Sequence, residues 1–98
     1  PPAIKDLAIV VDSKEPAETV RVRVEEIARG VGKEKFEVDP VTIFDLFEGK
    51  GLPEGKKSLA LTLRFRAPDR TLGEKELNQA FEEVIVGIRS GTAYELRS

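Results

Sequence analysis

The 98-residue sequence contains no cysteine, histidine, methionine or tryptophan. Without cysteine the chain forms no disulfide and offers no thiolate, which fits a cytoplasmic protein. Without histidine it lacks the commonest general base and the commonest metal ligand. No apolar run approaches the roughly 18 residues that a membrane helix needs, and no signal-peptide pattern opens the sequence. These absences argue against an enzyme, against a protein with a metal or cofactor, and against a membrane protein.

What is present indicates one globular domain over residues 1–98, since charged residues make up 35% and hydrophobic residues 40%. The start at Pro1-Pro2, without methionine, suggests a fragment or a processed product. The net charge of −2 argues mildly against a general nucleic-acid binder. The charge is segregated, however: residues 50–70 hold six bases and two acids, a net of +4, which leaves −6 for the remainder.

Residues 58–66 carry the clearest pattern in the chain, because apolar and polar side chains alternate strictly along them. Side chains of a strand point alternately to its two faces, so this pattern predicts one strand with an apolar face and a polar, cationic face. The apolar face holds Leu59, Leu61, Leu63 and Phe65, and the polar face holds Ser58, Ala60, Thr62, Arg64 and Arg66.

The remaining patterns predict further strands at 4–11, 41–47 and 92–97 and helices at 17–29 and 74–88. Residues 19–25 also alternate as a strand would, but their apolar stripe continues at helical spacing through Ile27, and Gly30 offers a stop. Thr71 is the expected N-cap of the second helix, with Glu74 as its capping-box partner.

The resulting order, βαββαβ, predicts an α+β, ferredoxin-like fold. Right-handed crossovers place both helices on one face of a four-stranded antiparallel sheet. The other face, with Thr62, Arg64 and Arg66, then stays uncovered and is the expected binding surface.

Three motifs in the sequence contain residue types that could bind a ligand or carry out chemistry. Residues 55–58 (GKKS) resemble the end of a phosphate-binding loop, but the required spacing fails and a strand follows where a helix should. Asp6 and Asp45 could share the open face, yet no nucleophile or metal-type cluster accompanies them, so pairing with nearby bases is favoured. Arg64 and Arg66 beside Phe47 suit single-stranded RNA, with cations for phosphate and a ring for a base. The alternative is a charged face that only keeps the sheet solvated, and the signature of the RNA-recognition motif is missing.

Several segments together resemble the ferredoxin-fold anticodon-binding domain. That family closes the C-terminus of the β subunit of bacterial phenylalanyl-tRNA synthetase and of the single-chain organellar enzyme. The most specific matches are residues 53–60 (PEGKKSLA) and 70–72 (RTL) at their mutual spacing. Weaker matches are residues 5–11 (KDLAIVV), 44–47 (FDLF), 63–65 (LRF), Gly49, Asn78 and 95–97 (ELR).

The resemblance implies a non-catalytic domain without cofactor that holds the anticodon stem-loop of tRNA(Phe). Its other partner would be the rest of the synthetase, and the isolated domain would be a monomer. The RNA-binding residues implied are Asp45, Phe47, Thr62, Arg64 and Arg66, with Lys56 and Lys57 near the edge.

Two alternatives stay open. The family usually has Arg where Lys5 stands and commonly Tyr where Phe47 stands, and the chain lacks four residue types at once. A designed ferredoxin-like domain with no retained ligand would explain this. An enzyme of the acylphosphatase type would need an Arg and an Asn at a phosphate-binding loop, but the only Asn, Asn78, falls in the second predicted helix.

Overall fold

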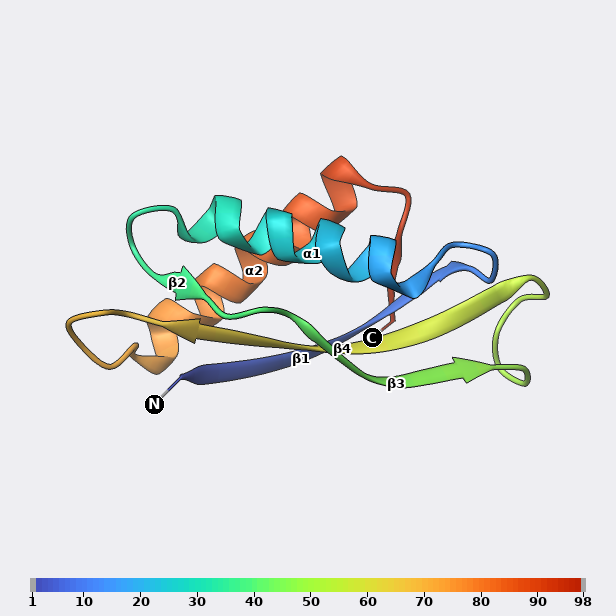
Figure 1. Cartoon of the computed structure of the whole chain (residues 1–98), viewed down its shortest axis with the longest axis horizontal. Coiled ribbons are helices and arrows are strands. Elements are labelled where there is room, and N and C mark those ends of the chain that lie inside the picture. Colours follow the sequence, from blue (N-terminus) through green and yellow to red (C-terminus); the bar gives the residue numbers. More distant parts are fainter. Residues whose placement is uncertain (1, 98) are drawn as a thin grey trace.

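The computed structural model describes residues 2–97 as two helices packed on one antiparallel sheet (Figure 1). The fold is the predicted α+β, ferredoxin-like one, with both helices on the same side of the sheet (Figure 1). The molecule is elongated, with extents of 45 × 22 × 21 Å. Its elements are β1 (Ala3–Asp12), α1 (Ala17–Gly32), β2 (Glu37–Val38), β3 (Thr42–Glu48), β4 (Lys56–Arg66), α2 (Glu74–Gly91) and β5 (Glu95–Arg97).

The sheet is built around the two long strands β1 and β4, which pair antiparallel from Ala3↔Phe65 to Asp12↔Lys56. Outside β4 lie β2 and β3, and outside β1 lies β5. The register places Leu7 opposite Leu61 and Ile9 opposite Leu59, so apolar residues of both strands share the helix side.

The predicted strand 41–47 is β3, and an additional two-residue strand, β2, precedes it, so the prediction of four strands is corrected to five. Pro40 has no N–H to give to the ladder. The backbone of Val41 is held by α1 instead: its N–H donates to Glu25 Oε1 at 2.8 Å, and its carbonyl accepts from Arg21 Nη1 at 3.1 Å. Further on, the register shifts by one residue between Ile43 and Asp45, which leaves Phe44 without a partner in the ladder.

The core lies between the sheet and the two helices, as the alternation of β4 predicted. Leu59, Leu61, Leu63 and Phe65 are fully buried. They are covered by a stripe of α1 (Val20, Val24, Ala28) and a stripe of α2 (Ala80, Val84, Ile88), all buried. Residues 19–25 are helical: Val20 and Val24 are buried whereas Val22 is exposed, although a strand would put all three on one face.

Three element ends differ from the predictions. Helix α1 continues past Gly30 to Gly32, and Lys33 ends it with a φ of 45°. Helix α2 begins after Gly73, which makes no side-chain cap, so the predicted Thr71 cap is wrong. The last strand is shorter because Thr92 closes α2, its Oγ1 donating to the Ile88 carbonyl at 2.7 Å.

Candidate nucleic-acid interface

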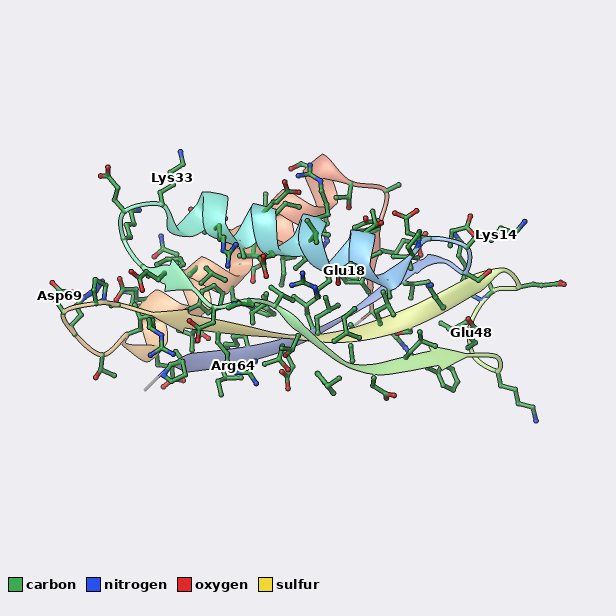
Figure 2. All side chains as sticks on the ribbon, viewed as in Figure 1. Lys14, Glu18, Lys33, Glu48, Arg64 and Asp69 are labelled. Atoms are coloured by element: carbon green, nitrogen blue, oxygen red, sulfur yellow. The ribbon has the colours of Figure 1, made fainter. Side chains whose placement is uncertain are left out.

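The face of the sheet opposite the helices, called the open face here, is formed by alternate residues of β1, β3, β4 and β5. Figure 2 shows Arg64 projecting from this side, away from both helices. The middle of the face has small side chains: Ala8 of β1 pairs with Ala60 of β4. These small side chains leave room above the sheet, which the side chains of Arg97 and Phe47 occupy.

Phe47 and Arg97 meet over this small-residue floor, although they come from strands at opposite edges of the sheet. The Arg97 guanidinium carbon lies 5.6 Å from the centre of the Phe47 ring, within the range of a cation–π contact. The ring is 40% exposed, whereas Ser58, which pairs with Phe47, is only 5% exposed. Phe47 thus presents a planar apolar surface on the open face.

Arg97 was missed as a site residue. The only sequence signal was its position in the ELR match, because the contact depends on how β5 sits against β1. The observed register pairs Arg97 with Ala8, and Ala8 with Ala60. Both neighbours are too small to block the long side chain from crossing the face.

Thr62 and Asp6 form a cross-strand pair on the open face. Thr62 Oγ1 donates a hydrogen bond to Asp6 Oδ1 at 2.8 Å. Thr62 is 7% exposed, so its hydroxyl is engaged within the protein, while Asp6 is exposed. Of this pair, the carboxylate is the group available to a ligand.

The two predicted arginines differ in their surroundings. Arg64 is half-buried and donates from Nη1 to Thr42 Oγ1 at 3.1 Å. Arg66 is clamped by Asp39 through two hydrogen bonds, of 3.2 and 2.8 Å. This bonding to Arg66 holds the pKa of Asp39 below its ordinary value. Arg64 is therefore the freer cation.

The remaining predicted residues lie in different places. Lys56 pairs with Asp12 at the end of the open face. Lys57 is 7% exposed and pairs with Val11 and Glu48, on the side of the sheet that bears Leu59 and Leu61. The structure therefore separates the two lysines. Asp45 is exposed opposite Ala60, and its Oδ1 accepts the Leu46 N–H at 2.9 Å.

The open face carries both signs of charge, which the run of bases in residues 50–70 did not reveal. The neighbouring strands bring acids beside the bases of β4. The charged members of this face are Asp6, Asp12, Asp45, Lys56, Arg64, Arg66, Glu95 and Arg97. Such a surface offers hydrogen-bond acceptors and a stacking ring as well as cations, so it suits base edges more than a bare phosphate backbone.

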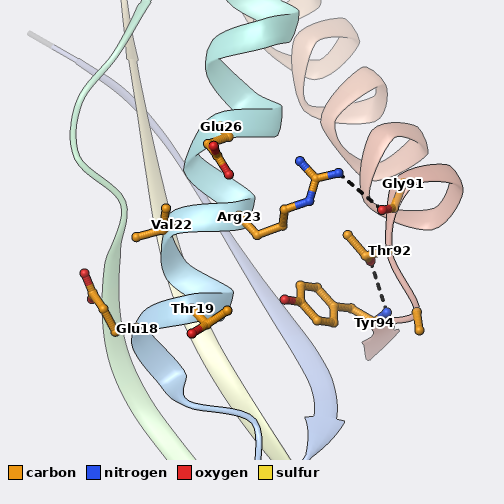
Figure 3. Close-up of a pocket in the computed structure, with 9 residues that line it drawn as sticks. Glu18, Thr19, Val22, Arg23, Glu26, Gly91, Thr92 and Tyr94 are labelled. Atoms are coloured by element: carbon orange, nitrogen blue, oxygen red, sulfur yellow. Dashed lines mark hydrogen bonds between the residues drawn. The ribbon is translucent and has the colours of Figure 1, made fainter.

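The helix side holds a separate cavity of about 550 Å³ between α1 and the connection from α2 to β5 (Figure 3). Arg23 crosses it and donates to the Gly91 carbonyl at 3.3 Å, and the Tyr94 N–H donates to Thr92 Oγ1 at 3.0 Å. The Tyr94 hydroxyl lies 3.4 Å from Glu15, and burial first, then that carboxylate, raise its pKa. These contacts join the first half of α1, and Glu15 just before it, to the C-terminal end of α2 and the connection that follows.

Other site types find little support among residues 2–97. No group of three or more acidic or other metal-ligating side chains lies together there. No helix in this part of the chain is long and apolar enough to cross a membrane. Asn78, which the acylphosphatase alternative requires, is exposed on α2.

Comparison with known proteins agrees with this geometry. Residues 1–97 match the family described as "Ferredoxin-fold anticodon binding domain". Similar curated proteins are phenylalanine–tRNA ligase β subunits. That of Corynebacterium efficiens is 51% identical over 76 residues, covering 78% of this chain and 8% of the relative. Those of Syntrophotalea carbinolica and Geobacillus kaustophilus are 35% and 34% identical over 97 residues, each covering 99% of this chain and 11% of the relative.

The chain thus spans about a tenth of the length of these relatives. The match of the family runs over every described element, from β1 to β5. The sequence motifs, the ferredoxin-like architecture and these similarities agree, and the chain belongs to the family of ferredoxin-fold anticodon-binding domains.

Proposed function

We propose that this domain binds the anticodon stem-loop of tRNA(Phe) through its open face and takes no part in chemistry. It would act as part of the β subunit of a cytoplasmic phenylalanyl-tRNA synthetase, whose other modules charge the tRNA. The observation that carries the proposal is the exposed Phe47 ring, held beside Arg97 over the floor of Ala8 and Ala60.

The proposed mode of binding follows from what an anticodon loop offers. Its unpaired bases can be splayed out, stacked on an aromatic ring and read at their edges. Phe47 would supply the ring, and the exposed Asp45 would accept N–H groups of a base edge. Arg64, held by a neutral hydroxyl and not by a carboxylate, would contact phosphate. The small side chains between these groups let the loop approach.

The stacking contact is tested by titrating a fluorescent tRNA(Phe) anticodon stem-loop with the purified domain and recording anisotropy. Loss of one base–aromatic stack costs about 1–3 kcal/mol, so Phe47→Leu should weaken binding between about fivefold and 150-fold. Phe47→Tyr keeps the ring and should bind within about twofold of the wild type. Equal affinities for the leucine and tyrosine variants would show that Phe47 does not contact the RNA.

The phosphate contact is tested by the salt dependence of the same titration. Arg64→Ala should reduce the slope of log K against log salt by about 1, because one phosphate contact and its released counterion are lost. The matched control is Asp39→Asn with Arg66→Gln, which dissolves the ion pair without changing net charge and should leave the slope unchanged. Absence of any binding by the wild type at low salt would instead favour a domain without a retained ligand.

A further inference from the structure

Asp6 is a carboxylate fixed on the open face with no cation to neutralise it. Among residues 2–97 no Lys or Arg nitrogen lies within 4.0 Å of its oxygens, and Arg64, two residues from Thr62 along β4, donates to Thr42. Its one recorded side-chain partner is the Thr62 hydroxyl at 2.8 Å. Because Thr62 is buried and rigid in the middle of β4, it holds Oδ1 in place and leaves Oδ2 free.

The position of Asp6 is at a margin of the sheet. Strand β5 pairs only with Ala8–Val10 of β1, so it stops short of Asp6. A hollow of about 210 Å³ lies there, lined by Asp6, Leu7 and Ala8 of β1, by Leu96 and Arg97 of β5, and by Phe81, Ile85 and Arg89 of α2. Asp6 therefore stands at the rim of a partly apolar recess, next to the Arg97 that lies over Phe47.

A carboxylate in this setting selects its ligand chemically. It accepts hydrogen bonds and donates none, so it suits the amino and imino groups of a base edge and repels phosphate. A base that brings no N–H group leaves the carboxylate desolvated and unpaired, which is costly. Asp6 should therefore lower overall affinity for RNA while raising discrimination between bases.

We propose that Asp6 is a specificity-determining acceptor for an amino-bearing base of the anticodon loop, and that Thr62 is the residue that positions it. This inference rests on the proposed function, since it assigns a role within the same face. It differs from the expectation that Thr62 touches RNA itself, because the Thr62 hydroxyl is already used.

The test compares anticodon stem-loops in which each amino-bearing loop nucleoside is replaced, one at a time, by the analogue that lacks only the amino group: inosine for guanosine, purine riboside for adenosine and 2-pyrimidinone riboside for cytidine. The wild type should lose about tenfold in affinity at one position, the size of a good carboxylate–base contact. Asp6→Ala should bind the unmodified loop at least as well and discriminate there by less than about threefold. Asp12→Ala, which removes a carboxylate from the same strand and face, should discriminate like the wild type.

The binding data distinguish a failure of the proposed role of Asp6 from a failure of the proposed RNA-binding function. A wild type that binds no stem-loop at low salt overturns both. A wild type that binds, with Asp6→Ala discriminating equally at every position, overturns the role of Asp6 alone.

Thr62 is tested in the same assay. Thr62→Val keeps the branched shape and removes the hydroxyl, so discrimination should fall, and Thr62→Ser should restore it. Unchanged discrimination by the valine variant, with an unchanged melting temperature, would overturn the positioning role.

Discussion

The two helices are in tight contact at Gly87, and this contact makes a quantitative prediction. A Cβ added at Gly87 would lie 2.7 Å from Ile27 Cγ2. Ordinary carbon–carbon contacts are about 3.5–4.0 Å, so the helices would have to separate by roughly 1 Å. By contrast, a Cβ added at Gly30 of α1 meets nothing within 4 Å. The same substitution is therefore free of contacts at one site and crowded at the other.

Two terms set the size of the effect. Replacing a helical glycine by alanine stabilises a helix by about 0.5–1 kcal/mol, because the unfolded chain loses less freedom. Overpacking a core contact costs about 1–3 kcal/mol. Gly30→Ala should show only the stabilisation that alanine gives to a helix. Gly87→Ala should show this stabilisation and also the cost of overpacking. The two variants should therefore differ in free energy of unfolding by about 1–3 kcal/mol, with Gly30→Ala the more stable.

The assay is thermal unfolding followed by far-ultraviolet circular dichroism. For a domain of this size 1 kcal/mol shifts Tm by about 4–8 °C, so the gap between the two variants is measurable. Gly32→Ala provides a second crowded site, because its Cβ would lie 2.9 Å from Phe36 Cε1. The Phe36 ring already packs edge-on against Phe65, at 5.4 Å between centroids. If Gly87→Ala melted as high as Gly30→Ala, the helix contact would not be tight and the reasoning would fail.

Two further predictions concern ionisation. The Asp39 pKa is lowered, so the Arg66 clamp stabilises the fold above the ordinary Asp value of about 4 and loses this effect as pH falls through the folded pKa. Asp39→Asn should therefore lower Tm at neutral pH, and the difference should shrink below about pH 4 in melts taken across pH. Tyr94, the single tyrosine, should ionise above the ordinary value of about 10 in an absorbance titration. Glu15→Gln should move this titration only part of the way back, because burial is the larger cause, and a complete return would contradict that order.

The parts of the fold that follow from local pattern could be predicted from the sequence. The alternation of Leu59, Leu61, Leu63 and Phe65 identifies the core strand because burial repeats with the period of the strand itself. The helices follow in the same way. The split of the edge strand could not be predicted, since it depends on Glu25 of a distant helix bonding to the Val41 N–H.

The candidate site was predicted less completely than the fold. Arg64 lies on the open face, as the period of two in β4 requires, whereas Phe47 reaches this face only because the register of β3 shifts between Ile43 and Asp45. The engagement of Arg66 by Asp39 and of Thr62 by Asp6 depends on partners 27 and 56 residues away in sequence. The contact of Arg97 with Phe47 also depends on two residues that are distant in sequence. Register between strands, and not composition along one strand, determines which of these groups is free.

The irregularity at Phe44 has a consequence for self-association. Strand β3 pairs with β4 alone, and its outer side carries exposed Phe44 and Leu46, a combination that invites a second chain to add its own strand. The slip in register at Phe44 twists and interrupts the backbone there, so no neighbour can run an unbroken ladder along it. We therefore expect the exposed apolar side chains of this edge strand to promote less strand-to-strand association than an unbroken strand would allow.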